Sequence, residues 1–478
     1  MPDAVTPTPT PPLNFVVVLT DDQGRWAMPH RMPELRMPHM TRLQQDALEL
    51  DQFYCASPVC SPARASLITG RMPSAHGVHD WLVGGRHADA KPDRYLEGQP
   101  TTPEILNDAG YECMMSGKWH VGHSQWAAPG FTRWYAHRYG GGPYYDAPVW
   151  QDGKEAAQEG YLTHAITDNA VGFLRDRDPA RPFYLQVNYT APHDPWIDNH
   201  PAGYLAPYRD CDFPSVPREP RHPWTDPRRR SFSAAFADPV PHLAGYCASL
   251  TAVDDGLAAL RAELETQGVW ENTVLLYTAD NGFSCGHHGI WGKGNGTFPL
   301  NFWDNSVRVP TVIRMPNGPR GVSDRLISAA SWHATVCELA GVIPPDDQWG
   351  VSESFADLLR GEQREQPETV VVLAEYGQGR MITDGRWKLV VRSEGPDELY
   401  DHHDDPDERT NLHVGAAGAM RGIRDDLTTA LHDWFADHER AGMSAYHRKV
   451  TGHGQIHPLS RGRSDAETYV PDGHPAPL

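Results

Sequence analysis

Two short pairs of Asp and Asn residues offer only oxygen ligands, and each is separated from a preceding apolar run by one or two residues. Asp21 and Asp22 follow the run FVVVL, and Asp280 and Asn281 follow the run TVLLY. Carboxylate and amide oxygens suit a hard cation such as Ca²⁺ or Mg²⁺, whereas zinc prefers histidine and cysteine. A single pair of this kind is usually a helix cap or a turn, but two pairs at two strand ends favour a metal site. We therefore predict that these four residues bind one divalent cation.

Cationic and imidazole side chains follow two further apolar runs. Lys118 and His120 come after the run CMM, and His193 comes after the run FYLQV. Lys293 and Arg64 could add the positive charge that an anion site needs in a chain whose formal net charge is -20. Taken singly, a lysine is usually solvated and a histidine is usually structural. We give the structural interpretation to His123, His287 and His288.

Cys60 lies in the stretch SPVCSPARASLITGR, just before a predicted helix that has Pro62 in its first turn. A helix N-terminus favours anions such as sulfate or phosphate, and it would lower the pKa of an unmodified thiol. Cys60 is therefore a candidate nucleophile. The alternative is a small buried hydrophobic residue.

The elements that must position these residues follow from the pattern of apolar runs. Buried strands are predicted at 15–19, 113–115, 183–187, 273–277 and 311–313. Helical patterns separate them, at 40–50, 102–109, 162–175 and 243–267. Strands that alternate with helices predict an α/β fold with a largely parallel sheet. In open sheets of this class the carboxyl ends of the strands line the ligand crevice, which would bring the clusters together.

The later part of the chain predicts a second, smaller unit. A helix at 330–340 is followed by loop-like sequence, by strand-like runs at 369–373 and 387–391, and by a helix at about 420–438. We predict a catalytic domain over 13–366, a C-terminal α+β subdomain with an antiparallel sheet over 367–445, and a polar tail over 446–478. The Pro- and Arg-rich stretch 196–241 lacks periodicity and is predicted to be a rim loop or a disordered insert.

Composition narrows the class of protein. With 62 acidic against 42 basic side chains, the chain is a poor partner for nucleic acid or anionic membranes. The first apolar run, 15–19, is too short for a signal peptide or a membrane span, so we expect a cytoplasmic protein. Seven cysteines without a framework spacing predict buried thiols and not a disulfide scaffold.

Together the motifs resemble those of the type I sulfatases in the alkaline-phosphatase-like superfamily. CSPAR at 60–64 matches their C-x-P-x-R signature, and GYECMMSGKWH at 110–120 resembles their second signature. The order of the acidic pairs, of His193 and of WGK at 291–293 is also similar, and DGRWKL at 384–389 and ELYD at 398–401 look like the family's C-terminal subdomain. The resemblance covers about 13–440. It implies a mixed, largely parallel sheet flanked by helices, with a smaller antiparallel sheet.

The resemblance also implies a chemistry. A formylglycine-generating enzyme would oxidise Cys60 to formylglycine, whose gem-diol attacks the sulfur of a sulfate ester. The metal, with Ca²⁺ preferred over Mg²⁺, would be bound by Asp21, Asp22, Asp280, Asn281 and residue 60 itself. The implied catalytic set is Cys60, Arg64 to orient the diol, Lys118 and Lys293 to neutralise the sulfuryl oxygens, His193 as general acid, Asp280 as base, and His120 to assist collapse to the aldehyde.

Departures from the family pattern define the rival hypotheses. Ala63 and Cys113 replace residues that are usually hydroxylic, but the cysteine, proline and arginine of the first signature remain. Asn281 stands where phosphodiesterase and phosphonate hydrolase relatives, like choline-sulfatase-type members, usually carry histidine. Asparagine favours the sulfate-ester branch typified by aryl and carbohydrate sulfatases. A phosphodiester or phosphonate monoester hydrolase is the first rival. A zinc phosphatase, which would need histidine-rich ligands, and a non-catalytic binder of sulfated glycans are the others.

The substrate is expected to be a small-molecule or oligosaccharide sulfate ester, aryl or carbohydrate. Aromatic and basic residues that could line a sugar-binding rim are Trp81, Trp126, Trp196, Trp224 and Arg228 to Arg230.

Overall fold

The chain was analysed as a computed structural model that describes residues 11–470 except 84–93, 152, 226–229, 352, 363, 365–366, 376–377, 394, 416–417, 449, 451 and 460–462. Its main feature is a ten-stranded mixed sheet with the order β13-β2-β12-β9-β1-β8-β4-β5-β6-β7. The strands, in sheet order, are β13 (Gly321–Ser323), β2 (Leu48–Leu50), β12 (Val312–Arg314), β9 (Thr273–Ala279), β1 (Asn14–Thr20), β8 (Phe183–Asn188), β4 (Glu112–Lys118), β5 (Phe131–His137), β6 (Ala147–Gln151) and β7 (Lys154–Gln158).

The middle strands β9, β1, β8, β4 and β5 all run parallel, and antiparallel pairs flank them at β12 and at β6. Strand β1 shows why the chain folds this way. Val16 and Val18 point into the core on one face, while Phe15 and Val17 point into the core on the other. Because both faces are buried, the strand is apolar throughout and does not alternate with polar residues. The predicted α/β class is confirmed.

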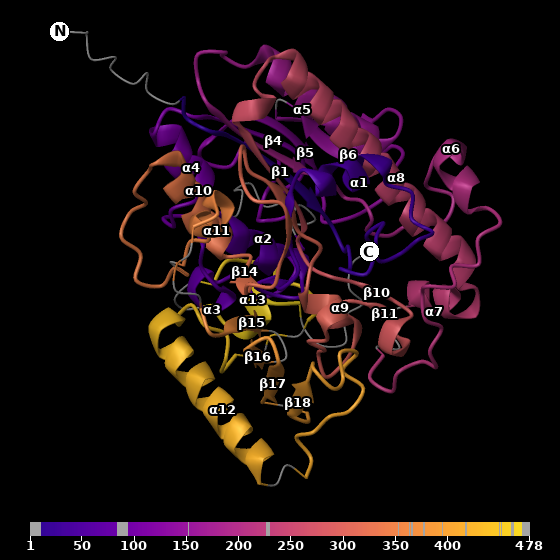
Figure 1. Cartoon of the computed structure of the whole chain (residues 1–478), viewed down its shortest axis with the longest axis vertical. Coiled ribbons are helices and arrows are strands. Elements are labelled where there is room, and N and C mark those ends of the chain that lie inside the picture. The colour runs from indigo at the N-terminus through magenta and orange to yellow at the C-terminus, as the bar shows by residue number, and fades with distance from the viewer. Residues whose placement is uncertain are drawn as a thin grey trace.

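Helices cover both faces of the sheet (Figure 1). The face that includes Val16 is packed by α1 (Pro38–Gln45), α5 (Leu162–Asp176) and α8 (Pro239–Thr266). The opposite face is packed by α2 (Cys60–Thr69), α4 (Thr102–Asp108), α10 (Ser331–Ala340) and α11 (Ala356–Arg360). Among the described residues, none of these helices combines the length and apolar composition that crossing a bilayer requires.

A separate antiparallel sheet, β15 (Val370–Ala374), β16 (Gly379–Thr383), β17 (Trp387–Arg392) and β18 (Glu398–Asp401), packs against α12 (Ala419–His438). It lies beside the large sheet, in the lower part of Figure 1. The predicted C-terminal antiparallel sheet is confirmed, but sequence reasoning identified β15 and β17 alone. The other two strands are short and include polar residues, so they lack a clear apolar run.

Short elements complete the fold. They are β3 (Phe53–Tyr54), β10 (Ser284–Cys285), β11 (Trp291–Gly292), β14 (Ile327–Ser328), α3 (Pro73–His76), α6 (Ala202–Leu205), α7 (Arg230–Ala237), α9 (Asp304–Val307), α13 (Asp465–Thr468), η1 (Ala206–Tyr208), η2 (Trp270–Asn272), η3 (His287–Gly289) and η4 (Gly294–Gly296).

Three sequence predictions need correction. The helix predicted at 40–50 ends at Gln45, and its last residues form the edge strand β2, whose register on β12 buries Leu48 and Leu50. The stretch 196–241 is not irregular throughout, because it contains α6, η1, α7 and the start of α8. Helical periodicity was hidden there by prolines at helix starts.

The third correction concerns the predicted polar tail, 446–478. Its described part is folded against the catalytic domain: Gln455 and Tyr469 are buried, and Ser464 begins α13 with a capping box. Few apolar residues are involved, since hydrogen bonds provide much of the contact. Composition alone therefore did not reveal it.

Candidate active site

Strands β1 and β9 place the two acidic pairs side by side. Their parallel register pairs Thr20 with Ala279, so the residues that follow leave the sheet at the same edge. The Asp22 amide lies 3.3 Å from Asp280 Oδ1. Ligand atoms of Asp21, Asp280 and Cys60 lie within 4.8 Å of one another. The predicted cluster therefore forms, from three segments that are distant in sequence.

The donor set fits a hard cation. Asn281 donates through Nδ2 to Asp22 Oδ1 at 2.7 Å and to the Gly282 carbonyl at 2.9 Å. Its Oδ1 atom is buried without a hydrogen-bond partner in the described structure. A buried carbonyl oxygen beside the carboxylates of Asp21, Asp22 and Asp280 is the all-oxygen environment that Ca²⁺ or Mg²⁺ requires.

Two buried lysines supply positive charge to this acidic cluster. Lys118, at the end of β4, forms an ion pair with Asp21. Lys293, which follows β11, forms an ion pair with Asp22, and its Nζ lies 2.7 Å from Cys60 Sγ. Both lysines are almost fully buried. Together with Arg64, the lysines balance the charge of the three carboxylates, so the site is far less acidic than the composition of the whole chain implies.

Cys60 is the first residue of α2, so the helix begins slightly earlier than predicted, since Cys60 was expected to lie just before it. Val59 caps the helix in an extended conformation, and Gly70 ends it in the left-handed region at φ 69°. Arg64 lies one turn after Cys60 and donates from Nε to Asp280 Oδ2 at 2.7 Å. It also donates from Nη1 to the Lys118 carbonyl at 2.9 Å, while its buried Nη2 has no partner among the described residues. Arg64 thus connects the helix to two strand ends.

Burial and the charges within the cluster shift the pKa values of Cys60 and Asp280. Burial raises the pKa of the Cys60 thiol to about 12, and the neighbouring Asp21 adds to the effect. The expectation of a lowered pKa was therefore wrong, because desolvation outweighs Lys118 and Lys293. Burial also opposes ionisation of Asp280, but Arg64 and the lysines outweigh it and lower the pKa of this carboxyl. An unmodified Cys60 would be a poor thiolate nucleophile here.

The two predicted histidines lie at this edge of the sheet. His193 donates through Nδ1 to the Asp194 carbonyl at 2.7 Å, and its Nε2 lies 3.7 Å from Asp22 Oδ2. His120 contacts the Leu82 carbonyl through Nε2 at 3.0 Å. Burial, together with Lys118 and Arg64, lowers the pKa of His120 well below its usual value, so its ring is neutral.

Left-handed backbone occurs at two of the site residues, Asp22 (φ 64°) and His120 (φ 54°). This conformation costs a residue with a side chain roughly 1–3 kcal/mol and is concentrated at functional sites.

Sequence reasoning missed a wall of this site. Residues 140–142 are three glycines that follow β5, and a Cβ on Gly140 would lie 2.1 Å from the His120 ring. A Cβ on Gly141 would lie 2.7 Å from the His193 ring. Strand β5 also ends at His137, in register with Lys118, and the buried Nε2 of His137 has no described partner. The glycine run was the available signal, but β5 is too polar to be recognised as a strand.

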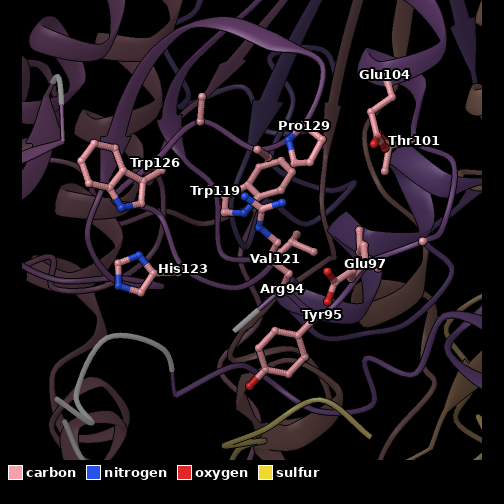
Figure 2. A pocket seen from close by; sticks show the side chains of 14 residues that line it. Arg94, Tyr95, Glu97, Thr101, Glu104, Trp119, Val121, His123, Trp126 and Pro129 are labelled. Atoms are coloured by element: carbon pink, nitrogen blue, oxygen red, sulfur yellow. The ribbon is translucent and has the colours of Figure 1, made fainter. Parts of the chain in front are cut away.

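The proposed sugar-binding rim is only partly supported. Trp196 is 4% exposed and belongs to the core, so its assignment to the rim was wrong. Trp126 is 56% exposed and lines a cavity of about 180 Å³ together with Trp119 and His123 (Figure 2). Trp81 and Trp224 are partly buried. Arg228 and Arg229 lie outside the described residues, and Arg230 begins α7.

Comparison with known families gives two matches. The model described as "Sulfatase" matches residues 13–342, and the model described as "N-sulphoglucosamine sulphohydrolase, C-terminal" matches residues 288–436. Together they cover the large sheet and most of the C-terminal sheet and helix.

Among curated relatives, the N-acetylglucosamine-6-O-sulfatase of Bacteroides thetaiotaomicron is 26% identical over 84% of this chain and 82% of its own length. The choline-sulfatase of Rhizobium meliloti is 27% identical over 89% of this chain and 86% of its own length. A solved structure in complex with its substrate D-glucosamine-2-N,6-O-disulfate has a TM-score of 0.75 at 23% identity, covering 90% of this chain and 98% of that one. The last similarity is one of fold.

Proposed function

Since this chain belongs to the sulfatase family and is a sulfuric ester hydrolase, we propose that it releases sulfate from a sulfated carbohydrate through a formylglycine at position 60. The observation that carries the proposal is the convergence of Cys60, three buried carboxylates and three buried cations at one sheet edge.

The residues that would hold a divalent cation are Asp21, Asp22, Asp280 and Asn281, with residue 60 beside them. We propose Ca²⁺, because three carboxylates and an amide oxygen form a set that this ion accepts readily. Such an ion supplies positive charge against the sulfuryl oxygens. The unpartnered Asn281 Oδ1 supports this assignment.

The chain's own residues divide the remaining work. Formylglycine, once hydrated, supplies the hydroxyl nucleophile. Lys118 and Lys293 lie on either side of the acidic cluster and would neutralise charge on the sulfuryl oxygens, which is electrostatic stabilisation of the transition state. The Nη2 of Arg64, which has no partner among the described residues, would orient the hydroxyls. Asp280, kept ionised by its lowered pKa, would accept the proton, although the same shift makes it a weak base.

The two histidines would serve opposite ends of the reaction. His193 is partly exposed, with 22% of its side chain accessible. It can therefore contact the alcohol part of a substrate that enters the site from solvent. We assign it the role of general acid toward the leaving alcohol. His120 is held deeper, and we assign it the proton transfer that restores the aldehyde.

Carbohydrate is favoured over other alcohols because the C-terminal family model, one curated relative and the solved structure all carry names of aminosugar sulfates or their sulfatases. Choline-sulfatase provides the alternative. A panel of sulfated mono- and oligosaccharides with choline sulfate would decide. Turnover of choline sulfate alone would contradict the carbohydrate assignment.

The rival phosphodiester or phosphonate activity is tested by relative rates. We expect faster turnover of an aryl sulfate than of an aryl phosphodiester, because Asn281 stands where those relatives usually carry histidine. Faster phosphodiester turnover would reverse the choice.

Metal and modification are tested separately. Dialysis against a chelator is expected to abolish activity and Ca²⁺ to restore it more fully than Mg²⁺. Peptide mass spectrometry is expected to find formylglycine in place of Cys60 in protein made with a formylglycine-generating enzyme. An unmodified thiol in fully active protein would contradict this part of the proposal.

We also propose the division into a catalytic domain at 13–366 and a C-terminal subdomain at 367–445, and a cytoplasmic location. The absence of disulfides among the seven cysteines, all within the described residues, supports a reducing compartment.

A further inference from the structure

The C-terminal segment around Gln455 lies outside both matched family models and contacts the active-site edge. Gln455 is completely buried and forms a parallel bridge with Leu82. Its main-chain N–H donates to the Trp81 carbonyl at 2.8 Å, and its carbonyl accepts from the Val83 amide at 3.1 Å. The segment at 81–83 is therefore held from the C-terminal side.

The side chain of Gln455 extends this contact. Its Oε1 accepts from the His79 amide at 2.9 Å, and its Nε2 donates to the carbonyls of Gly77 and His457, both at 3.1 Å. Both ends of the amide are used, which fixes its orientation. One buried glutamine thus ties down the main chain on both sides of residue 80.

Leu82 faces the other way. In an extended chain, successive peptide groups point to opposite sides, so the groups of Leu82 point away from Gln455. The Leu82 amide donates to Ser61 Oγ at 3.0 Å, and its carbonyl lies 3.0 Å from His120 Nε2. Ser61 is the neighbour of Cys60. Gln455 therefore supports a peptide that touches both the nucleophile helix and a catalytic histidine.

The contact with Leu82 determines which ring nitrogen of His120 carries the hydrogen. A carbonyl can only accept, so Nε2 is the donor, and in a neutral ring Nδ1 must then be the acceptor. His120 Nδ1 is buried and has no partner among the described residues. It is the atom left available to receive a proton from the reacting group.

We propose that Gln455 is a positioning residue for the sulfatase reaction: it holds the main chain at 81–83 so that the Leu82 carbonyl keeps His120 in the tautomer whose Nδ1 accepts a proton. This rests on the role given to His120 under the proposed function. The C-terminal segment would then help to position an active-site residue.

The test is a double-mutant cycle with an aryl sulfate substrate. Gln455→Ala is expected to lower kcat by on the order of 10-fold with KM unchanged, because a displaced His120 weakens a step after substrate binding. In a His120→Ala background, the same substitution is expected to change kcat less than 2-fold. Equal losses in both backgrounds, or a rise in KM at constant kcat, would overturn the proposal.

Two further variants keep the test decisive. Gln455→Met keeps the length of the side chain but none of its three hydrogen bonds, so it serves if Gln455→Ala does not fold and is expected to show a similar loss. Ser464→Ala weakens the exposed capping box of α13 in the same segment and is expected to leave kcat unchanged.

A structural readout separates this proposal from the function that it rests on. A crystal structure of Gln455→Ala is expected to show the Leu82 carbonyl moved away from His120 Nε2. An unchanged contact would overturn the proposal even if wild-type protein hydrolyses sulfate esters. A wild type inactive on every sulfate ester would instead overturn the proposed function.

Discussion

At the scale of single residues, the site reverses the ordinary expectation for a cysteine at a helix N-terminus. Burial and Asp21 raise the pKa of Cys60 to about 12, although Lys293 touches its sulfur. A thiol that is this hard to ionise has little use as a nucleophile. Lys118, Lys293 and Arg64 are better suited to binding the oxygens of an anion at position 60 after the residue has been converted.

Removal of Cys60 tests this directly. Cys60→Ala is expected to lower kcat/KM roughly 10⁴-fold or more while leaving thermal stability nearly unchanged, since the lost atom acts in chemistry and not in packing. Cys211→Ala, at a partly exposed cysteine, is the matched control and should retain full activity. Initial rates on an aryl sulfate provide the measurement. Full activity in Cys60→Ala would show that residue 60 does not provide the nucleophile.

His193 should matter in proportion to how poorly the leaving group leaves. His193→Ala is expected to slow an alkyl or sugar sulfate by about 10²–10⁴-fold, the range for general acid catalysis, and an activated aryl sulfate much less. The measurement is a series of rates against leaving-group pKa for wild type and variant. Parallel losses across the series would contradict the general-acid role.

At the scale of elements, the glycine run after β5 acts as a wall for two imidazole rings. Gly140→Ala would place a methyl group 2.1 Å from a ring atom of His120, so the ring must move. A displacement near 1 Å can cost about 10²-fold in rate. We expect kcat to fall by that order, as measured on an aryl sulfate.

Gly172→Ala provides the control for this loss. Gly172 lies within α5, and a Cβ there meets nothing within 4 Å. Alanine at this position should leave kcat unchanged and raise stability by about 0.5–1 kcal/mol, because glycine is a poor helix residue. Equal effects of the two substitutions on activity would argue against the wall.

The end of β15 carries a carboxyl with pH-dependent consequences. Burial of Glu375 raises its pKa from 4.5 to about 7, against the opposing effect of Arg380. The folded protein then binds one more proton than the unfolded chain between these pH values. Stability from this group is therefore full below pH 4.5 and falls by about 3 kcal/mol as the pH rises to 7.

Glu375→Gln is expected to remove this dependence. Urea unfolding between pH 5 and 8 should give a flatter profile than wild type, with higher stability at pH 8. Glutamine can still accept the hydrogen bond that Glu375 Oε2 takes from the Ala445 amide at 2.8 Å. The exposed Glu362→Gln should keep the wild-type profile, and an unchanged slope in Glu375→Gln would show that Glu375 does not cause it.

The elements that sequence predicted best are those with strong apolar periodicity. Strands β1, β8 and β9 and helices α5 and α8 were predicted to within a few residues, and so were the polar residues at the strand ends. Strand β5 and the segment around Gln455 were missed because polar contacts position them. Such contacts depend on partners far away in the chain, such as Leu82 for His120, and leave no local pattern.

At the scale of the molecule, a buried network of ion pairs joins the C-terminal sheet to the part of the chain that contains the ten-stranded sheet. Lys388 of β17 is fully buried and donates to Asp304 Oδ1 at 2.8 Å, and it also pairs with Glu408. Glu408 in turn accepts from the Asp304 amide at 2.6 Å. Asp304 begins α9 in the catalytic domain, so the network fastens the C-terminal sheet to that domain.

The substitution Lys388→Met tests how strongly this ion network attaches the C-terminal sheet to the rest of the fold. It leaves the buried Glu408 carboxylate without its lysine, while Asp304 keeps Arg308, and removing one partner of a buried ion pair typically costs about 3–5 kcal/mol. Burial opposes ionisation of Asp304, but Lys388 and Arg308 lower its pKa below 3.8, so the pair stabilises the fold above that pH and loses its effect as the pH falls through the lowered value. Urea unfolding at pH 7 is expected to show the C-terminal sheet unfolding first, with a deficit that is still nearly complete at pH 4 and shrinks only as the pH falls further. Arg364→Met, which removes an exposed ion pair with Glu338, should leave the unfolding midpoint nearly unchanged. If Lys388→Met unfolds at the wild-type midpoint, the attachment of the two sheets must come from apolar packing such as that of Val370 and Val372 against the catalytic core.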